Sequence, residues 1–470
     1  MSLILPGNVA SALPTGYDVD NSCRFDDGSS AKLTQTFGTP TTANKFTLSF
    51  WIKRSSFQIG TNTQNILNTE TGNLEEMIRF EEQDRLHIFL QNSAGAATAS
   101  VKPSYQFRDP AAWYHIVIGV DTTQSTDTNR FKFWVNGSRL TAFTTTTYVS
   151  QNYTLRLNTA VEHEFGVRKG GAFLDAYIAE LVFIDGQQLD ADQFGEYNED
   201  SPTIWQPKDV TGLTFGNNGF YLDFEDSGDL GDDESGNSND WTESGLAATD
   251  QSTDTCTNNF ATWNPLFRKG TTTPAFAENN LKSTFDDGGA NEFALTTFGV
   301  SAGKWYAEVK WPSNTGTAAT ATGILDMAYT GTDDPNNAVT NAFGYFGSGT
   351  KNVSGTASSY GDSYADNDII GIAIDMDNNK LYFSKNGTFQ DSGDPTSGST
   401  GTGAISIVSG VTYGIFASDY NSQVAELNTG SPPFSISSGN SDANGYGNFE
   451  YSVPSGYLAL CTKNLGSDGG

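Results

Sequence analysis

The sequence predicts an all-β protein that consists of two β-sandwiches joined by an acidic Gly/Ser/Asp-rich linker. The chain has 470 residues, and single hydrophobic cores seldom grow beyond about 300 residues, so two domains are expected. Strand-forming aromatic residues, among them 31 Phe and 19 Tyr, are mixed with turn-forming residues that include 50 Gly. Long amphipathic helical patterns are absent, and residues 190–197 would hold about two helical turns at most.

The composition is strongly acidic. Lys and Arg number 25 against 55 Asp and Glu, which gives a formal net charge of −30. Such a charge repels nucleic-acid phosphates and anionic membrane surfaces, so we expect no nucleic-acid partner and no membrane insertion. The acidity either keeps the protein soluble and monodisperse, or reflects surroundings in which salt or divalent ions screen the surface. We favour the first interpretation.

The three cysteines, Cys23, Cys256 and Cys461, are odd in number and widely spaced, which gives no disulfide framework and no paired metal-binding motif. Synthesis in the cytosol fits this pattern. Residues 1–20 are predicted to form an extended arm that docks on a neighbouring subunit. The arm has no basic region and only a short apolar run, unlike a signal peptide, so work outside a cell would require export on a particle.

The first predicted domain, residues 21–205, contains strands at short intervals. Residues 45–54 alternate in the manner of a half-buried strand, and sheets built from such strands pair face to face to hide one side. One side of this strand carries Phe46, Leu48, Phe50 and Ile52, and the other carries Thr47, Ser49, Trp51 and Lys53.

Four segments of this domain occur in an order that resembles laminin-G and concanavalin-A-like jelly rolls. They are FTLSFWIKR at residues 46–54, WYHIV at 113–117 with Asp121 after it, FWVNG at 133–137, and AYIAELVFIDGQQLD at 176–190. The set covers roughly 180 residues and is more specific than any one of its segments. The resemblance implies a jelly-roll or concanavalin-like sandwich.

Residues 206–280 are predicted to form the acidic linker. The run FEDSGDLGDDESGNSNDW at residues 224–241 is rich in Asp, Gly, Ser and Asn and offers almost nothing to bury. The later run TNNFATWNPLF at residues 257–267 adds aromatic residues. These aromatic residues suggest that the linker packs against a domain.

The second predicted domain, residues 281–435, resembles SPRY domains and is followed by a C-terminal extension, residues 436–470. The segments that carry the resemblance are GKWYAEVKW at 303–311, DIIGIAIDMDNNKLYFSKNG at 368–387, and VAELNTGSPPF at 424–434. The central segment predicts a hairpin whose turn contains Asp377, Asn378 and Asn379. A Gly/Ser/Thr-rich insertion at 391–403 departs from the family pattern. The family's binding surface is therefore not inferred for the end of the sandwich where this loop lies.

The whole arrangement resembles proteins of tailed bacteriophages. These share a laminin-G-like domain, a linker of the pattern D-x-S-G-N-x-N-D-W, a SPRY-like domain and a tail of the pattern P-x-G-Y-x-A-L-C-T-x-N-L, which here occupies residues 454–465. The resemblance implies a virion surface protein of the tail or capsid that is synthesised in the host cytoplasm and contacts other virion proteins. By analogy with fibre proteins we expect a homo-oligomer, namely a trimer.

Acidic and histidine side chains do not form a recognisable catalytic motif, and we assign no catalytic residue. The carboxylate spacing does not match the E-x-D-x-x-E pattern of concanavalin-like glycosidases, so a solvated strand edge is predicted instead. The histidines lie in strand-like sequence and are predicted to be packed and hydrogen-bonded. The residues concerned are Glu75, Glu76, Glu81, Glu82 and Asp84, and His87, His115 and His163.

Calcium is the one ion that the sequence suggests. Laminin-G-like domains often carry a site at the sandwich rim, and Asp and Asn supply the oxygen ligands that calcium prefers. The first candidate set is Asp232, Asp233, Asn237, Asn239 and Asp240, and the second is Asp375 with Asp377. The alternatives are a disordered acidic loop for the first set and a hairpin turn for the second.

Sugar binding would use aromatic rings that stack on the C–H faces of a pyranose. Each ring could instead belong to the core or the rim of its domain. The candidates are Trp134 and Tyr153 in the first domain, and Tyr345, Tyr360 and Tyr364 in the second.

Three functions compete. The first is a non-enzymatic virion structural protein, of the tail-fibre or receptor-binding type, that attaches to a host surface glycan or receptor. The second is a capsid decoration or collar protein with a purely architectural role, favoured by the lack of a coiled-coil or β-helical shaft. The third is a glycan depolymerase. Display of many copies on a particle would let weak sites act together, so the first two roles are compatible.

Overall fold

The structure is a computed structural model that describes residues 16–57, 63–267, 274–285, 292–313, 319–331, 333–335, 337, 339–419 and 422–468. Its regular structure is almost entirely strand, which confirms the predicted all-β class. The described residues up to Thr257 form one compact unit and those from Asn258 onward form another. They are termed the N-terminal unit and the C-terminal unit. Residues 1–15 of the predicted arm lie outside the described residues.

The first sheet of the N-terminal unit has eight strands in the described part of the chain. Along the sheet they are β10 (Ser138–Arg139), β9 (Phe131–Val135), β8 (Trp113–Asp121), β3 (Lys45–Arg54), β13 (Ala176–Asp185), β1 (Ser22–Phe25) and β18 (Gln251–Ser252), with β16 (Phe220–Leu222) paired to β13. All of these pairs are antiparallel.

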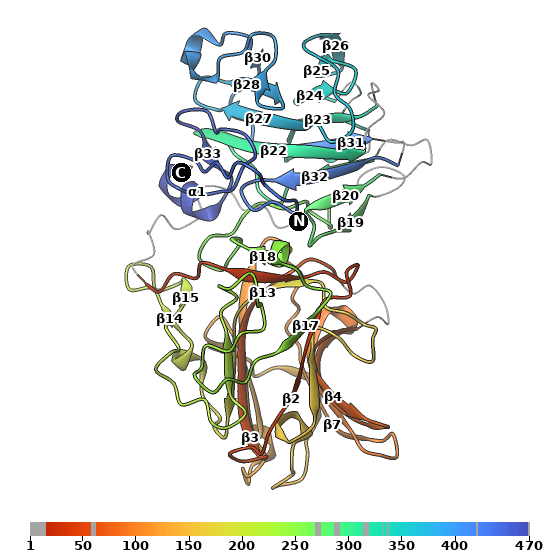
Figure 1. The fold of residues 1–470 in the computed structure, drawn as a ribbon, viewed down its shortest axis with the longest axis vertical. Coiled ribbons are helices and arrows are strands. Elements are labelled where there is room, and N and C mark those ends of the chain that lie inside the picture. The colour runs from red at the N-terminus through yellow and green to blue at the C-terminus, as the bar shows by residue number, and fades with distance from the viewer. Residues whose placement is uncertain are drawn as a thin grey trace. The chain divides into compact units, whose positions relative to one another are not determined.

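The second sheet of this unit faces the first across the core, and Figure 1 shows β3 on one side and β4 and β7 on the other. Its order is β11 (Phe143–Thr147), β7 (Ala97–Pro103), β6 (Arg85–Gln91), β5 (Leu74–Glu81), β4 (Gln64–Thr71), β12 (Glu162–Phe165), β2 (Lys32–Thr36) and β17 (Thr242–Ser244). A separate pair is formed by β14 (Gly195–Tyr197) and β15 (Trp205–Pro207). Short 3-10 turns are η2 (Glu82–Asp84), η3 (Asp127–Asn129), η4 (Arg156–Asn158), η5 (Ala191–Gln193) and η6 (Ala248–Asp250).

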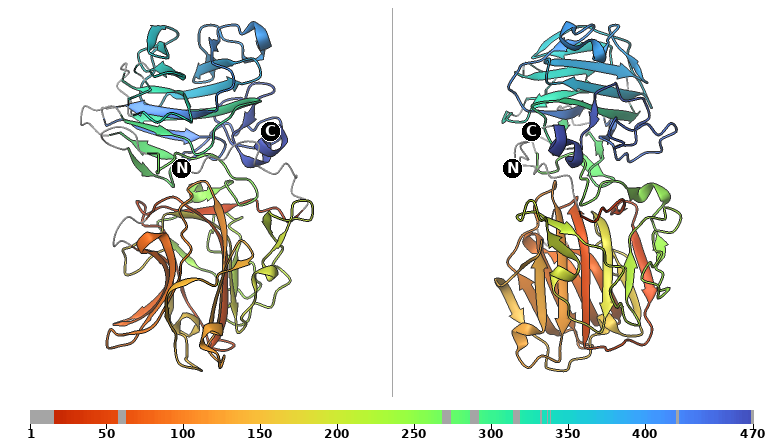
Figure 2. Two further views of the ribbon diagram at one scale, coloured as in Figure 1. Left: turned by 180° about the vertical axis from the view of Figure 1, so that it is seen from behind. Right: turned by 90° about the vertical axis from the view of Figure 1, so that its left-hand side faces the viewer.

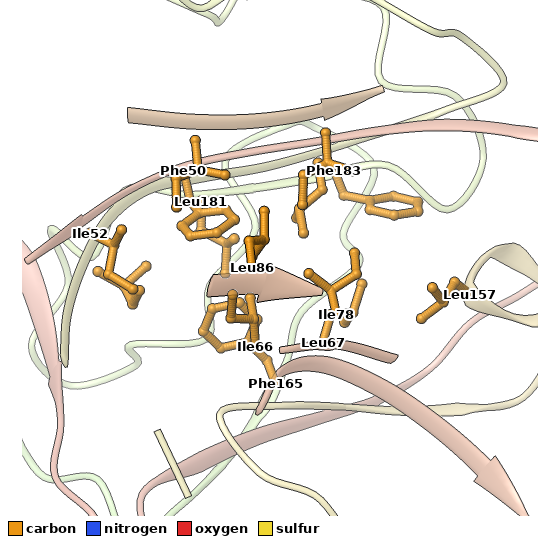
Figure 3. Packing of buried hydrophobic residues seen from close by; sticks show 14 of the residues in the cluster. Phe50, Ile52, Ile66, Leu67, Ile78, Leu86, Leu157, Phe165, Leu181 and Phe183 are labelled. Carbon is orange, nitrogen blue, oxygen red and sulfur yellow. The ribbon is translucent and has the colours of Figure 1, made fainter. Parts of the chain in front are cut away.

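The core of the N-terminal unit lies between these sheets. Apolar residues from the inner side of β3, such as Phe50 and Ile52, meet Ile78 and Leu86 of the second sheet (Figure 3). The predicted division of β3 into two sides is confirmed, since Phe46, Leu48, Phe50 and Ile52 all belong to this cluster. The opposite side of β3 is buried as well, because residues 186–221 cover the outer side of the first sheet.

Trp205 holds this covering layer on the sheet. Its indole N–H donates to Nδ1 of His115 at 2.8 Å, and Nε2 of His115 lies 2.9 Å from the Ser49 hydroxyl. A Cβ atom at Gly137 or Gly195 would approach the Trp205 ring to 2.4 or 2.7 Å, so both positions require glycine. Burial lowers the pKa of His115 to about 3, and the packed, hydrogen-bonded role predicted for this histidine is confirmed.

A β-bulge at Glu180 keeps the inner side of β13 apolar. The pairing with β3 shifts between Ala179 and Val182, and Glu180 has a φ of 51°. Ile178 and Leu181 consequently both face the core. Glu180 is 6% exposed, and the Tyr221 hydroxyl donates to both of its carboxylate oxygens at 3.0 Å. Burial raises the pKa of Glu180 to about 8, and nearby carboxylates add to the effect.

The predicted linker, residues 206–280, is not a separate connecting segment. Residues up to 257 belong to the N-terminal unit, in which β16, β17 and β18 extend its two sheets. The sequence looks too polar to fold because its apolar residues are widely spaced, yet most of its large aromatic and aliphatic side chains are buried. Those that join the core are Phe220, Leu222, Phe224, Leu230 and Trp241.

The C-terminal unit is also built from two sheets, and Figure 1 shows β22 between β27 and β32. One sheet contains β19 (Ala275–Ala277), β20 (Lys282–Thr284), β32 (Val424–Asn428), β22 (Lys304–Ser313), β27 (Ile369–Asp375), β28 (Lys380–Lys385) and β29 (Thr388–Phe389), with β30 (Ile405–Ser406) on β28 and β33 (Leu458–Ala459) on β22. The other contains β21 (Glu292–Leu295), β31 (Tyr413–Asp419), β23 (Ala321–Asp326), β24 (Ala342–Phe346), β25 (Thr350–Val353) and β26 (Thr356–Ser359). The layers of both units can be followed in Figure 2.

The hairpin predicted around residues 377–379 is confirmed as β27 and β28. The 3-10 turn η7 (Pro395–Thr400) lies in the insertion, and the helix α1 (Thr462–Asp468) ends the described chain. Within the described residues, no helix has the length and apolar character needed to cross a membrane.

The C-terminal extension covers the outer side of the sheet that contains β22. Tyr306 of β22 packs against Phe449 and Tyr457 of the extension. Glu308 of β22 is fully buried and accepts hydrogen bonds from the backbone N–H groups of Glu450 (3.0 Å) and Tyr451 (2.8 Å). Burial raises the pKa of Glu308. The extension is therefore an integral layer of this unit.

Replacing Leu222 with Ala tests whether residues 206–257 belong to the fold. The side chain is fully buried in the core, so the substitution should lower the free energy of unfolding of the N-terminal unit by about 2–5 kcal/mol, measured by urea denaturation. The exposed Thr146→Ala substitution should change it by less than about 0.5 kcal/mol. Equal stability of the two variants would contradict this arrangement.

Replacing Glu180 with Gln should alter the pH dependence of stability. The folded protein binds the Glu180 proton more tightly than the unfolded chain, because its pKa rises from 4.5 to about 8 on folding. The stability that this proton provides is complete below pH 4.5 and is lost as the pH rises toward 8, by an amount on the order of 4 kcal/mol. Thermal unfolding between pH 5 and 8 should show this decline in the wild type and a flatter profile in Glu180→Gln.

Candidate functional site

The outer side of the second sheet of the N-terminal unit carries a dense group of charged side chains. They project from β4, β5, β6 and β7 and from the turn after β12. This charged face comprises Glu70, Glu75, Arg79, Glu81, His87, Lys102, Arg168 and Lys169. On β5 the pattern is period two: Glu75, Arg79 and Glu81 point outward, while Ile78 and Phe80 enter the core.

Glu75 organises one half of the charged face. Its carboxylate accepts from Nη2 of Arg168 at 2.8 and 2.6 Å, and Lys169 Nζ lies 2.5 Å away. Lys169 also reaches Glu70 at 2.9 Å. Burial of Glu75 opposes ionisation, but the hydrogen bonds from Lys169 and Arg168 outweigh it and lower the pKa of Glu75.

A tight turn presents Arg168 and Lys169. Arg168 and Gly171 exchange both of their backbone hydrogen bonds at 3.0 Å. Lys169 and Gly170 between them have φ values of 54° and 66°. Two successive residues with positive φ are the signature of the hairpin turns that match strand twist. The turn thus fixes both cations over the sheet.

Glu81 organises the other half. It pairs with Arg79, whose Nε and Nη2 lie 3.1 and 2.8 Å away, and it also contacts Lys102 and Nδ1 of His87. Nε2 of His87 lies 2.9 Å from the Ser100 hydroxyl. Burial and the neighbouring Arg79 lower the pKa of His87 to about 3, so this ring is neutral at physiological pH. Burial and Arg168 lower the pKa of Arg79 to about 10.

Two amide groups lie on the same face between these halves. Asn65 pairs with Arg79 across β4 and β5, and Asn68 pairs with Met77. Both asparagines are almost fully buried, and neither Oδ1 accepts a hydrogen bond from the protein. An unpaired buried acceptor costs about 1–3 kcal/mol, so two together indicate unmet hydrogen-bonding capacity on this face.

The acidic group predicted to form a solvated edge is mostly buried, and this prediction is wrong except for the exposed Glu82. Asp84 pairs with Arg54 at 3.1 Å and with Arg108 at 3.0 Å. Glu76 faces the core, accepts from the Leu157 N–H at 3.1 Å, and has a pKa raised by burial to about 7. Adjacent carboxylates of β5 therefore face opposite ways, and their partners give each a structural role.

The aromatic residues predicted to bind sugars do not form exposed platforms. Tyr345 and Tyr364 are fully buried, and Tyr360 is 6% exposed and packs on Tyr345 with ring centroids 5.4 Å apart. Trp134 is 6% exposed beneath the covering layer. Tyr153 is half-buried and directs its hydroxyl to Glu76. Because a stacking ring needs a free face, these predictions are wrong for the four buried rings.

The predicted calcium ligands form a self-bonded loop. Asp233 accepts from the backbone N–H groups of Tyr221 (2.9 Å), Ser235 (2.9 Å) and Asn239 (2.8 Å). Asn237 and Asn239 donate to backbone carbonyls, and Asp240 accepts from the Asp233 N–H at 3.2 Å. Their polar groups thus shape the loop, as Asx turns do.

Within the described residues, no group of three or more His, Cys, Asp or Glu side chains is placed to hold a metal ion. Asp232, the remaining member of the first set, lies among carboxylates whose repulsion adds to burial in raising its pKa. In the second set, Asp375 accepts from the Asn378 N–H and Asp377 from the Gly303 N–H, both at 2.9 Å. The geometry supports the hairpin-turn interpretation for the second set, whereas the first set forms an ordered, hydrogen-bonded loop and not the disordered loop given as its alternative.

Sequence reasoning did not identify Arg79, Arg168 or Lys169. The outward alternation of Glu75, Arg79 and Glu81 was a usable signal, because charges on one side of a strand with an apolar opposite side indicate an open sheet face. The turn at residues 168–171 comes about 90 positions later, and no local pattern places it over β5.

Two family models match the chain. Residues 26–193 match a model described as the concanavalin A-like lectin/glucanases superfamily, and residues 304–410 match the SPRY domain. The chain therefore carries a concanavalin A-like domain in its N-terminal half and a SPRY domain in its C-terminal half, as the sequence motifs predicted. No curated protein matches the chain.

Solved structures resemble single domains of the chain. The SPRY domain of human HERC1 has 20% identity, covering 32% of this chain and 89% of that one, with a TM-score of 0.26. A heptameric SAP-like pentraxin from Limulus polyphemus has 17% identity, covering 38% and 82%, with a TM-score of 0.28. A second human SPRY domain has 14% identity, covering 31% and 90%, with a TM-score of 0.24.

Replacing Arg168 with Gln should raise the pKa of Glu75. The substitution removes a charged hydrogen-bond donor, whereas the burial that disfavours the Glu75 carboxylate remains. A carboxyl-carbon NMR titration of the labelled protein would measure the change. Arg139→Gln also removes one positive charge, but from the exposed strand β10 of the other sheet, and should leave this titration unchanged. An unaltered pKa in Arg168→Gln would contradict the pairing.

Proposed function

We propose that this protein is a non-enzymatic structural protein of a virus particle, of the tail-fibre or receptor-binding type, that attaches to a glycan or another receptor on the host surface. The arrangement of its motifs, which resembles that of tailed-bacteriophage proteins, supports the virion assignment. Its lectin-like and SPRY domains are compatible with binding. The charged face is the observation that carries the attachment role.

The charged face offers hydrogen-bond donors that are already held in place. Arg168 uses Nη2 for Glu75 and its Nε is buried, but the side chain is 30% exposed, which leaves the outer part of the guanidinium for a ligand. Lys169 is 44% exposed. Pairing with carboxylates restricts these long side chains before a ligand arrives, which reduces the entropy lost on binding.

Hydroxyl-rich ligands match this mixture of groups. A sugar hydroxyl both donates and accepts, so it can pair with the guanidinium and with the carboxylates beside it. The local balance of Arg and Lys against Glu also avoids the repulsion that an acidic glycan would meet elsewhere on a chain with net charge −30. Weak single sites would gain strength from display in many copies on a particle.

Arg168→Gln should weaken binding of the full-length protein to host surface glycans by about 10- to 150-fold, because a charged hydrogen bond contributes about 1.5–3 kcal/mol. A glycan array followed by calorimetry on the strongest ligand would measure this. Arg139→Gln should bind as the wild type does. No binding on the glycan array together with no adsorption to host cells would contradict the attachment role. Release of reducing sugar from host polysaccharide would contradict a non-enzymatic role.

An architectural role in the capsid or collar is the second candidate. The described residues contain one short α-helix, α1, and no long helical shaft, which suits a compact particle component. Localisation of the chain in a cryo-EM map of the assembled particle separates the two roles. A position buried among other virion proteins, with the charged face covered, would favour the architectural role.

A further inference from the structure

A buried ion pair joins two distant parts of the N-terminal unit. Lys53 lies on the outer side of β3, and Asp254 follows β18, 201 residues later in the chain. Nζ of Lys53 lies 2.7 Å from Oδ2 of Asp254, and each side chain is only 1% exposed. An amine and a carboxyl group, the two groups that condense to form an amide, are thus held in direct contact away from water.

Aromatic side chains enclose the pair. The Tyr177 ring lies 5.3 Å from Nζ of Lys53, and Trp113 belongs to the same buried cluster together with Trp51. The indole N–H of Trp113 donates to Oδ1 of Asp254 at 3.0 Å. The carboxyl group therefore has one oxygen against the amine and the other against a neutral donor.

An apolar enclosure favours the uncharged forms of both groups. Burial lowers the pKa of Lys53, although Asp254 and Asp109 oppose this shift. Transfer of one proton along the contact from Lys53 to Asp254 converts the ion pair into a neutral amine beside a neutral carboxylic acid. The neutral amine is the nucleophilic form of lysine.

We propose that Lys53 and Asp254 condense to form an intramolecular amide bond. Nζ of Lys53 attacks Cγ of Asp254, and the negative charge that develops on Oδ1 is stabilised by the Trp113 N–H. Oδ2 then leaves as water, carrying the proton received from the ammonium group and a second proton from Nζ. The products are a neutral Nζ–Cγ amide and one water molecule, with no oxidant or other reactant.

Proximity accelerates this reaction. Fixed groups in contact react with effective concentrations of about 10⁵–10⁸ M, and the apolar surroundings disfavour the charged starting pair. The amide would bind β3 to the segment after β18 covalently, in a unit whose cysteines, Cys23 and Cys256, are free.

The mass of the intact, denatured full-length protein tests the proposal. After storage of the folded protein at neutral pH until the mass is constant, the wild type should be about 18 Da lighter than its sequence predicts, the mass of one water. Proteolysis should give a branched peptide that contains both Lys53 and Asp254. The full sequence mass together with separate linear peptides would overturn the proposal.

Two variants identify where the water is lost. Lys53→Arg preserves the positive charge but has no nucleophilic amine, so it should keep its full sequence mass. Lys304→Arg alters a partly exposed lysine that lies 3.0 Å from Asp375 and should retain the deficit. A deficit that persists in Lys53→Arg would show that water is lost elsewhere, for example by cyclisation at an Asp-Gly pair, and would also overturn the proposal.

Discussion

Burial of the outer side of the sheet that contains β3, β8 and β13 is the constraint on which the N-terminal unit depends. Polar groups on that side cannot be solvated, so each must find a partner within the protein. The partners are Trp205 of the covering layer, Tyr221 of β16 at the side of β13, and Asp254 after β18. The buried polar groups of the sheet therefore determine which polar residues must pack against them. The three pairs are Lys53 with Asp254, His115 with Trp205, and Glu180 with Tyr221.

The second sheet of the same unit is not covered in this way. Its outer side remains partly accessible, and its charges are balanced by ion pairs such as those of Glu75 and Glu81. The carboxylates of Glu75 and Glu81 are buried, so they need the hydrogen bonds and charges of their Arg and Lys partners, whose own side chains are partly exposed. The exposed parts of Arg168 and Lys169 are what the proposed attachment role uses.

Local patterns in the sequence were sufficient for much of the fold. The alternation in residues 45–54 gave the inner side of β3, and the turn chemistry at 377–379 gave the hairpin of β27 and β28. Burial of both sides of β3 could not be predicted, because the cover is formed by residues well over 100 positions away. Contacts between different strands also explain the errors at Tyr345, whose ring packs on Tyr360, Tyr364 and Phe383, and at Trp134, which lies beneath the covering layer.

The predicted linker failed for a related reason. Composition averages over a window, and the window at residues 224–241 is dominated by Asp, Gly, Ser and Asn. Packing depends on individual residues, and Leu230 and Trp241 in that window are both buried in the core. The intervening polar residues bond to one another around Asp233. A low apolar content thus coexists with a fixed structure when the polar groups satisfy each other.

In each unit, further residues cover an outer side of the sandwich. Most of these residues lie beyond the segment that matches the family. Residues up to 257 complete the first unit after a match that ends at 193, and the C-terminal extension completes the second after a match that ends at 410. Glu308 shows how firmly the second layer is held, because its buried carboxylate accepts two backbone N–H groups of the extension. Sheet faces that are covered by the chain itself cannot meet a receptor. The layer formed by residues 186–221 packs on the first sheet and leaves the charged face of the second sheet uncovered, which is the face on which the proposed attachment role rests.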